Sequence, residues 1–345
     1  MTLDQIGWSA FFEQRWRELG RTSLVPGRIA SSLRGAYVVW TEQGETEAPA
    51  RAKLVRDPLT KPTTGDWVGL ELNPPVIQEL LPRRTQVSRK APGEETVEQV
   101  LGANVDRLFL VVGLDRDFNL RRLERYLSVG WASGAQPYIV LNKADLHEDR
   151  SELVAAVRRV AGKAPVVETS AATGEGVDAL RALLEPGLTV ALMGSSGVGK
   201  SALTNRLLGV DLREVGEVRE TDGRGRHTTV GREILLAPAG WLLMDLPGLR
   251  EIQPWEEEGV ERAFEDVERF AAECRFRDCQ HEVEPGCAVR AAVEAGELDE
   301  ARVANYRNVL NEIGRLEQRQ SSRASAEPRR QPRRVHRAFR KTPKR

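Results

Sequence analysis

The chain has 345 residues, which is enough for two or three domains with a sizeable core, and its formal net charge is zero. Its apolar runs are too short to cross a membrane, and its first residues lack the basic start and apolar run of a secretory signal. We therefore expect a soluble cytoplasmic protein without a membrane partner. The net charge hides an asymmetry, because residues 91–320 carry 28 Lys/Arg and 40 Asp/Glu whereas residues 321–345 carry 10 and 1. A basic end on an acidic body indicates a polyanionic partner.

The N-terminal part has two patterns. Residues 8–19 place apolar side chains at helical spacing, which predicts a short amphipathic helix within an extension of residues 1–24. Residues 25–90 then favour a small β-barrel of the oligonucleotide-binding type, because short β-rich runs alternate there with turn residues. The expected strands are 27–29, 36–40, 50–55, 66–72 and 76–81. Basic side chains in this segment fit either a phosphate-binding surface or an ordinary solvated one.

A charged, turn-rich stretch at 83–104 is typical of a linker into the next domain, which we place at residues 91–252. In that domain apolar runs alternate with helical patterns, and this predicts a mostly parallel sheet with helices on both faces. The expected strands are 108–112, 137–141, 164–167, 188–193, 234–236 and 241–244, and the expected helices are 120–130, 152–161, 177–184 and 202–208.

Polar motifs follow two of these strands. Asn142-Lys143-Ala144-Asp145 resembles the guanine-binding motif of Ras-like GTP-binding proteins, in which the aspartate accepts bonds from the ring N–H and the exocyclic amine. Adenine cannot donate that pair, so the motif selects GTP over ATP. Ser170-Ala171, after the next strand, resembles the companion loop whose backbone contacts the guanine carbonyl.

The strand at 188–193 is followed by a run with the spacing of a phosphate loop. Successive glycines let backbone N–H groups face one anion at a helix N-terminus, the lysine reaches the β and γ phosphates, and the final serine ligates Mg²⁺. A Gly/Ser-rich turn before a helix is the simpler alternative, although all fixed positions and both flanks match. The predicted binding residues for GTP or GDP are Gly194, Ser195, Ser196, Gly197, Val198, Gly199, Lys200, Ser201 and Ala202.

Two later segments complete the expected nucleotide site. Asp245-Leu246-Pro247-Gly248 is placed to hold Mg²⁺ through Asp245 and to sense the γ phosphate through the Gly248 N–H. In the segment from Arg224 to Thr229, the Thr229 hydroxyl would join Ser201 and Asp245 around Mg²⁺ only when γ phosphate is present. For this polar segment an ordinary surface loop is the alternative.

The order of the motifs is informative. In an ordinary GTPase the phosphate loop precedes the guanine-binding loops, whereas here it follows them, so the domain is predicted to be circularly permuted. This order, together with three sequence runs, resembles the RsgA (YjeQ) family of bacterial GTPases over about residues 25–313. The runs are Gly225-Arg226-His227-Thr228-Thr229, Gly65-Asp66-Trp67-Val68, and Asp278-Cys279-Gln280-His281 with Glu284-Pro285-Gly286-Cys287-Ala288-Val289. The resemblance implies a barrel, a permuted GTPase domain, a C-terminal zinc domain and late maturation of the small ribosomal subunit, with that subunit and its rRNA as partners.

All three cysteines of the chain lie close together with one histidine. Cys274, Cys279, His281 and Cys287 form a complete tetrahedral Zn²⁺ ligand set, which predicts one structural zinc ion; buried cysteines without metal are the alternative. Helical patterns at 260–272, 288–295 and 301–316 predict a small helical domain, residues 253–318, that the metal stabilises.

The end of the chain, residues 319–345, is rich in arginine and contains prolines. We expect it to be disordered when free and to follow an RNA backbone, although a membrane-surface or merely solubilising tail is the alternative.

Catalysis needs an oriented water molecule, and Leu249 stands where a Ras-like enzyme has its water-positioning glutamine. We therefore expect the protein to hydrolyse GTP slowly by itself and faster when the small subunit is present. We also expect it to be a monomer. The resemblance suggests His227 as the catalytic replacement, with Arg224 or Arg226 as alternatives. Leu246 departs from the small hydroxyl residue usual in the family. A GTP-binding RNA-binding protein with negligible catalysis and an ATP-dependent kinase are the competing functions.

Overall fold

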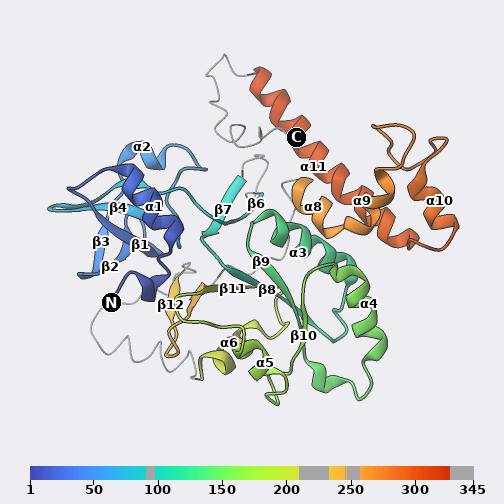
Figure 1. Cartoon of the computed structure of the whole chain (residues 1–345), viewed down its shortest axis with the longest axis horizontal. Helices are drawn as coiled ribbons and strands as arrows, with labels where there is room; N and C mark the ends of the chain where they lie inside the picture. Colours follow the sequence, from blue (N-terminus) through green and yellow to red (C-terminus); the bar gives the residue numbers. More distant parts are fainter. Residues whose placement is uncertain (91–97, 210–232, 245, 247–256, 327–345) are drawn as a thin grey trace.

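A computed structural model describes residues 1–90, 98–209, 233–244, 246 and 257–326. Figure 1 shows a β-barrel beside a sheet with helices on both faces, and a group of C-terminal helices beyond them. Within the described ranges, no helix combines the length and the apolar character needed to cross a bilayer.

The N-terminal sheet is a closed barrel. Its strand order is β3-β2-β1-β4-β5, and every neighbouring pair is antiparallel. The strands are β1 (Val25–Ser32), β2 (Tyr37–Thr41), β3 (Gly44–Ala48), β4 (Trp67–Leu72) and β5 (Pro75–Leu80). A parallel bridge closes the barrel, because Arg51 N donates to Ile77 O at 3.0 Å and Ile77 N donates to Pro49 O at 2.9 Å. The predicted barrel is therefore confirmed.

Aromatic packing attaches the N-terminal helices to this barrel. Helix α1 (Ala10–Leu19) follows the short turn η1 (Asp4–Ile6), and its Phe12 ring lies 5.6 Å from the ring of Trp67. Trp8 meets the same indole edge-on at 4.6 Å. Since Trp67 and Phe12 are almost fully buried, the predicted amphipathic helix covers one side of the barrel.

One predicted strand of the barrel is wrong, and one strand was not predicted. The stretch 50–55 forms a short helix, α2 (Ala52–Val55), with Leu54 buried, whereas the polar segment Gly44–Ala48 forms β3. Strand β3 pairs with β2 through its backbone and leaves most of its side chains exposed, so it carries little of the alternating apolar pattern by which strands are recognised.

The stretch 83–104, predicted to be a linker, is instead a hairpin. Strands β6 (Gln86–Lys90) and β7 (Glu98–Ala103) pair antiparallel and bury Val87 and Leu101. Gly102 explains part of this packing, because a Cβ there would lie 2.3 Å from Met244 Sδ. The hairpin thus joins the barrel to the next sheet.

The central sheet has the strand order β10-β9-β8-β11-β13-β12, with β12 antiparallel at one edge and all other neighbours parallel. Its strands are β8 (Arg107–Gly113), β9 (Gln136–Asn142), β10 (Val166–Glu168), β11 (Thr189–Met193), β12 (Ile234–Leu236) and β13 (Leu242–Met244). The predicted, mostly parallel sheet is confirmed. The chain proceeds outward from β8 to β10 and returns to β11 on the other side of β8. Ligands bind at such a reversal, beyond the carboxyl ends of the strands.

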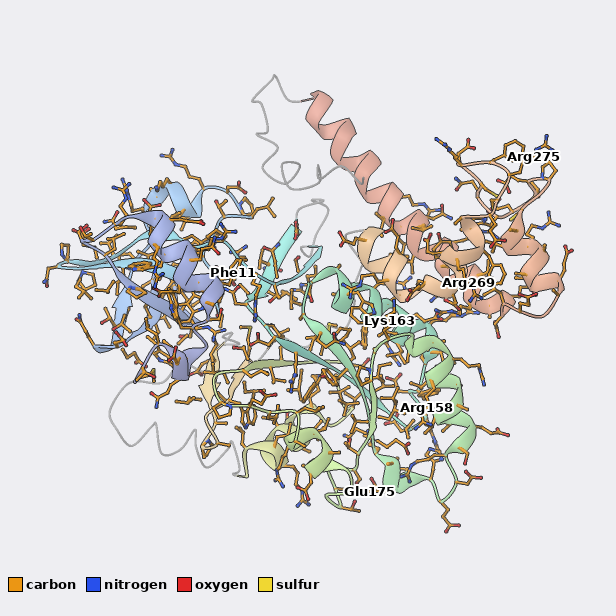
Figure 2. All side chains as sticks on the ribbon, in the orientation of Figure 1. Phe11, Arg158, Lys163, Glu175, Arg269 and Arg275 are labelled. Atoms are coloured by element: carbon orange, nitrogen blue, oxygen red, sulfur yellow. The ribbon has the colours of Figure 1, made fainter. Side chains whose placement is uncertain are left out.

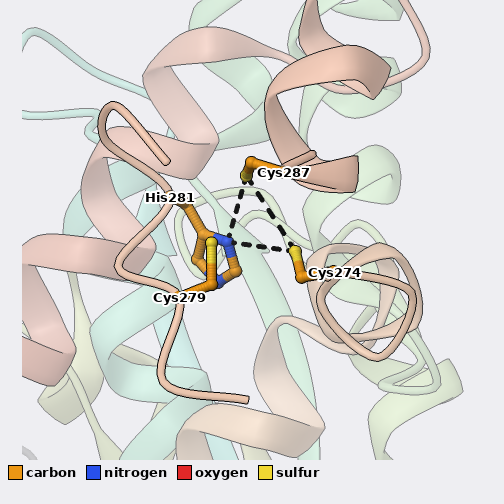
Figure 3. A group of neighbouring side chains, drawn as sticks. All are labelled: Cys274, Cys279, His281 and Cys287. Carbon is orange, nitrogen blue, oxygen red and sulfur yellow. Dashed lines mark hydrogen bonds between the residues drawn. The ribbon is translucent and has the colours of Figure 1, made fainter. Parts of the chain in front are cut away.

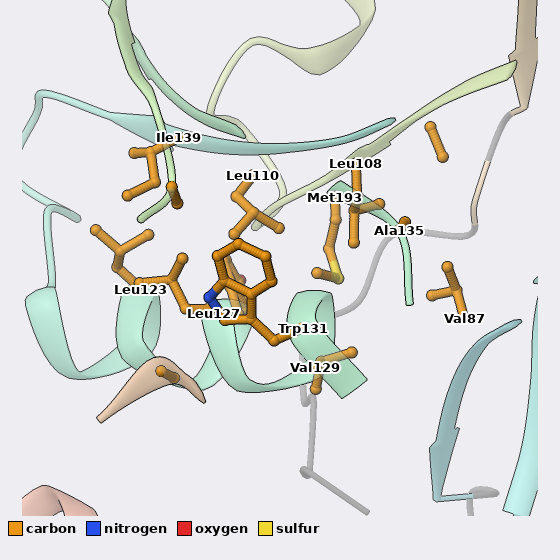
Figure 4. Close-up of a cluster of buried hydrophobic side chains, with 14 of the residues drawn as sticks. Val87, Leu108, Leu110, Leu123, Leu127, Val129, Trp131, Ala135, Ile139 and Met193 are labelled. Atoms are coloured by element: carbon orange, nitrogen blue, oxygen red, sulfur yellow. The ribbon is translucent and has the colours of Figure 1, made fainter. Parts of the chain in front are cut away.

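Helices cover both faces of this sheet. Helices α3 (Leu120–Ala132) and α4 (Ser151–Ala161) pack on one face, and α5 (Val177–Arg181) and α6 (Lys200–Leu208) pack on the other. Figure 4 shows Leu123, Leu127 and Trp131 of α3 beside Leu108 and Leu110 of β8. The intervening residues of β8 belong to the opposite core, as the two-residue period of a strand requires.

The C-terminal helices are α8 (Glu257–Ala263), α9 (Glu265–Ala271), α10 (Ala288–Glu294) and α11 (Glu300–Ala326). The single helix predicted at 260–272 is broken at Phe264, whose buried ring packs against Tyr306 and Arg302 of α11. Helix α11 includes residues 319–326, so the predicted disordered tail is wrong for these residues. Lys163, labelled in Figure 2, donates to Glu265 Oε1 at 2.7 Å and links the sheet domain to α9.

Candidate functional site

The loop between β11 and α6 depends on two glycines. A Cβ at Gly194 would lie 2.3 Å from Val111 O, and a Cβ at Gly199 would lie 2.3 Å from Asn142 Nδ2. Gly199 also has a positive φ of +95° and caps the start of α6. The backbone therefore approaches its neighbours closely here and leaves the N-terminus of α6 at the mouth of the loop, where an anion is favoured.

Lys200 lies across this loop. Its Nζ donates to Gly194 O at 2.7 Å and to Ser195 O at 2.8 Å. Val198 is buried, whereas Ser196, Gly197, Ser201 and Ala202 are exposed at the loop and in the first turn of α6. The ammonium group is thus held within the loop, and Ser196 and Ser201 are exposed to solvent.

Asn142 joins three loops. It ends β9 and is 1% exposed. Its Nδ2 donates to Val198 O at 2.8 Å, and its Oδ1 accepts from Ala171 N at 2.9 Å. Because both ends of one amide are used, the predicted guanine-binding motif, its companion loop and the phosphate loop are assembled around a single side chain.

The next residue has a partner that sequence reasoning missed. Lys143 has a φ of +64°, and its Nζ donates to Asp115 Oδ2 at 2.5 Å. This bond holds the pKa of the Asp115 carboxyl below its ordinary value of 3.8. Asp115 lies just beyond the carboxyl end of β8, so the strand-end position that singled out Asn142 could also have found it. Asp145 is exposed on the turn η2 (Ala144–Leu146).

The companion loop is a closed turn after β10. Ser170 is fully buried, and its Oγ accepts from Thr173 N at 3.1 Å. Its own N–H donates to Glu175 O at 2.9 Å. These bonds fix the backbone of Ala171, whose N–H contacts Asn142.

A second residue that sequence reasoning missed contacts the phosphate loop from α3. The Tyr126 hydroxyl lies 3.0 Å from Ser195 Oγ, at hydrogen-bond distance. Tyr126 is 3% exposed, and a buried tyrosine within a helix gives no sequence signal of such a role.

Four predicted site residues, His227, Thr229, Asp245 and Gly248, lie outside the described residues. Leu246, which departs from the family pattern, is described and is 2% exposed. Its Cδ2 lies 3.0 Å from the position of a Cβ on Gly102, so its side chain packs against β7.

The four predicted metal ligands converge (Figure 3). Cys274 follows α9, Cys279 and His281 come from the next loop, and Cys287 caps the start of α10. His281 Nδ1 lies 3.6 Å from Cys274 Sγ and 3.4 Å from Cys287 Sγ, and these two sulfurs are 3.9 Å apart. Ligand atoms around a tetrahedral ion of zinc's size are about 3.5–3.8 Å apart, so the cluster can hold such an ion.

One carboxylate shapes the loop between these ligands. Glu284 accepts from the N–H groups of Gln280, Glu282 and Val283 at 2.9–3.0 Å, and these bonds lower its pKa to about 2. They enclose His281, which has a φ of +58°. Burial lowers the pKa of His281, which favours the neutral imidazole that a metal requires.

Comparison with known proteins decides the family. A sequence model described as RsgA GTPase matches residues 80–255, about half of the chain. A "Small ribosomal subunit biogenesis GTPase RsgA" of Opitutus terrae is 47% identical over 329 residues, covering 90% of both chains. The chain belongs to the RsgA GTPase family. A second RsgA protein, from Streptomyces avermitilis, is 42% identical and covers 94% of this chain and 89% of its own.

Solved structures agree with this RsgA-family assignment. The crystal structure of YjeQ from Thermotoga maritima is 28% identical, with a TM-score of 0.64, covering 84% of this chain and 98% of that one. The crystal structure of YloQ, described as a circularly permuted GTPase, is 24% identical, with a TM-score of 0.59. The match covers 89% of this chain and 98% of the YloQ chain, and it shows the fold. The predicted permuted fold is confirmed.

Proposed function

We propose that this RsgA-family protein is a GTP hydrolase that binds the small ribosomal subunit and acts in its late maturation. The printed names of its relatives support the ribosomal role. The observation that carries the nucleotide site is the position of Asn142, which contacts both Val198 of the phosphate loop and Ala171 of the companion loop.

In this proposal, guanine is recognised by Asn142, Lys143 and Asp145, with backbone contacts from Ser170-Ala171. The phosphates lie on Gly194–Ser201 and the start of α6, including Ala202. Mg²⁺ would be held by Ser201, Thr229 and Asp245 and would neutralise charge on the β and γ phosphates. The Gly248 N–H would sense the γ phosphate.

Hydrolysis would be slow without a partner, because Leu249 cannot orient water. His227 would take that role when the small subunit is bound, since a neutral imidazole can accept a hydrogen bond from the attacking water. Hydrolysis would then trigger release of this protein from the subunit.

The metal site supports a structural zinc ion, held by Cys274, Cys279, His281 and Cys287, which would hold α9 and α10 in place. The barrel, these helices and the basic end of the chain would bind rRNA in the cytoplasm, and the protein would act as a monomer.

To test this function, the rate of GTP hydrolysis is measured for the protein by itself and with purified small subunits. Physiological salt is used because it suppresses nonspecific binding by basic segments. Large subunits are the control. We expect the rate of GTP hydrolysis to rise with small subunits but not with large ones, and we expect this rise to be lost in His227→Ala. Equal turnover under all conditions would contradict the proposal.

A second function is a GTP-binding RNA-binding protein with negligible catalysis, which Leu249 favours. Loss of function in Lys200→Ala but not in His227→Ala would support this alternative. A preference for ATP in a competition assay would instead support an ATP-dependent kinase.

A further inference from the structure

Helix α3 lies between the phosphate loop and the C-terminal helices. Tyr126 and Glu124 are two residues apart within one turn of this helix, so their side chains point to opposite sides, and both are buried, at 3% exposed. They contact different parts of the molecule, so α3 connects two regions that are far apart along the chain.

On one side, α3 contacts the nucleotide site. The Tyr126 hydroxyl is 3.0 Å from Ser195 Oγ. The neighbouring Leu123 and Leu127 are fully buried in the core beneath the sheet (Figure 4). Because close packing holds these side chains, the Tyr126 hydroxyl cannot move far unless α3 moves.

On the other side, α3 carries a buried charge that the C-terminal helices neutralise. Glu124 Oε1 accepts from Arg302 Nη1 of α11 at 2.6 Å, and Glu124 Oε2 accepts from Asn305. Arg302 is 8% exposed and also forms two bonds of 2.6 Å with Asp266 of α9. Removing the Arg302 guanidinium while the helices stay packed would leave the Glu124 carboxylate buried without its cation, which is strongly unfavourable.

Backbone packing strengthens the same connection. A Cβ on Gly259 of α8 would lie 2.1 Å from Ser128 O and 2.7 Å from Ala132 Cβ of α3. The two helices are therefore in direct backbone contact. Arg125 of α3 also pairs with Glu312 of α11. Since α8, α9 and α11 all contact α3 or its partners, we expect these helices to move together with α3.

We propose that Tyr126 is a positioning residue for the phosphate loop, and that α3 couples this loop to the C-terminal helices through Glu124 and Arg302. The proposal rests on nucleotide binding at Gly194–Ser201. Coupling of this kind is reciprocal, so nucleotide binding must alter the C-terminal helices as much as these helices alter nucleotide binding.

The first experiment measures dissociation of N-methylanthraniloyl-GDP from the full chain. Tyr126→Phe keeps the ring and removes the hydroxyl, and we expect about three- to ten-fold faster dissociation, the effect of one neutral hydrogen bond. Ser195→Ala should have the same effect, and the double variant should be no faster than either single variant. Tyr138→Phe is the matched control, because Tyr138 lies in β9 with its ring 5.8 Å from that of Phe109.

Additive effects of Tyr126→Phe and Ser195→Ala, or dissociation at the wild-type rate in both, would overturn the positioning role. Failure of the wild-type chain to bind the labelled GDP would instead contradict the proposed nucleotide site. The two failures are therefore distinguishable.

The second experiment tests the coupling. Glu124→Gln should accelerate nucleotide dissociation in the wild-type background but not in Tyr126→Phe, because both changes interrupt one connection. Asn305→Ala, a milder change to the same cluster, should act in the same direction. Thermal unfolding shows whether each variant is folded. If Glu124→Gln and Asn305→Ala both lower the thermal stability but leave the rate of nucleotide dissociation unchanged, the contacts of Glu124 have only a structural role. That result would overturn the proposed coupling.

Hydrogen exchange provides the reciprocal measurement. Labelled GDP should change amide protection in α9 and α11 of the wild-type chain, and this change should be smaller in Tyr126→Phe. An equal change in both proteins would contradict transmission through Tyr126.

Discussion

Asn142 Nδ2 donates to the carbonyl of Val198 at 2.8 Å, although the two residues are 56 positions apart in the chain. The bond joins the carboxyl end of β9 to the phosphate loop. The other end of the same amide accepts from Ala171 N, so one buried side chain sets the relative position of three loops. The predicted nucleotide site therefore depends on tertiary contacts as well as on its motifs.

Asn142→Ala should weaken both nucleotide binding and the fold. It leaves the buried Val198 carbonyl and the Ala171 N–H without their partner, and each such group costs about 1–3 kcal/mol. Urea unfolding and binding of labelled GDP measure the two effects. Asn308→Ala, at an exposed position of α11, is the control. Wild-type affinity in Asn142→Ala would contradict the assigned role.

Two glycines of the phosphate loop should respond differently to alanine. Gly197 has a φ of +81° with open space around a Cβ, so Gly197→Ala should cost about 1–2 kcal/mol of backbone strain. Gly199→Ala adds a Cβ 2.3 Å from Asn142 Nδ2, so it should destabilise the fold further and displace the guanine-binding loop. Urea unfolding of both variants tests the difference, and equal losses would contradict it.

Asp145→Ala should remove the preference for guanine. A site that forms hydrogen bonds to a substrate rejects an analogue lacking the matching groups by about 10⁴-fold or more, and alanine cannot accept the two guanine bonds. Competition of GTP and ATP for the labelled nucleotide measures this preference. Retained selectivity in Asp145→Ala would place guanine recognition elsewhere.

Removing the proposed zinc ion should unfold the C-terminal helices in part. The ligand atoms of three cysteines and one histidine lie within 4.8 Å of one another, and a chelator would remove the cation proposed to join α9 to α10. We expect one zinc ion per chain by elemental analysis and a loss of helical circular dichroism after chelation. Glu284→Ala should weaken zinc binding, since it releases three backbone N–H groups, whereas Glu297→Ala, at an exposed position, is the control. Unchanged zinc affinity in Glu284→Ala would contradict this role.

The Asp115–Lys143 pair should give a defined pH dependence. The hydrogen bond from Lys143 lowers the pKa of Asp115 below 3.8, so the folded state binds this proton less readily than the unfolded state. The stabilisation is therefore present above about pH 4 and is lost as the pH falls through the folded pKa. Asp115→Asn should lower the free energy of unfolding by about 0.5–1 kcal/mol at pH 7 and by less near pH 3. A difference that does not change with pH would contradict the pair.

The sequence by itself determined the order of the motifs and most of the central domain. The apolar runs 108–112 and 188–193 predicted β8 and β11, because buried parallel strands read as continuous apolar segments. The clustering of all three cysteines with His281 predicted one metal site, which needs no knowledge of distant contacts. The order of the motifs and three sequence runs carried the resemblance to the RsgA family, and the comparisons confirmed it.

Only the tertiary structure decided which side chains complete the site. Tyr126 and Ser195 are 69 positions apart, and Asp115 and Lys143 are 28 apart, so no local pattern joins them. The polar strand β3 and the hairpin β6–β7 were also missed, because their backbones pair with little of the apolar alternation that reveals a strand. Neighbouring residues in the sequence are enough to predict helices, strands and buried faces. The contacts named here form only after the chain has folded, because folding brings residues together that are far apart in the sequence.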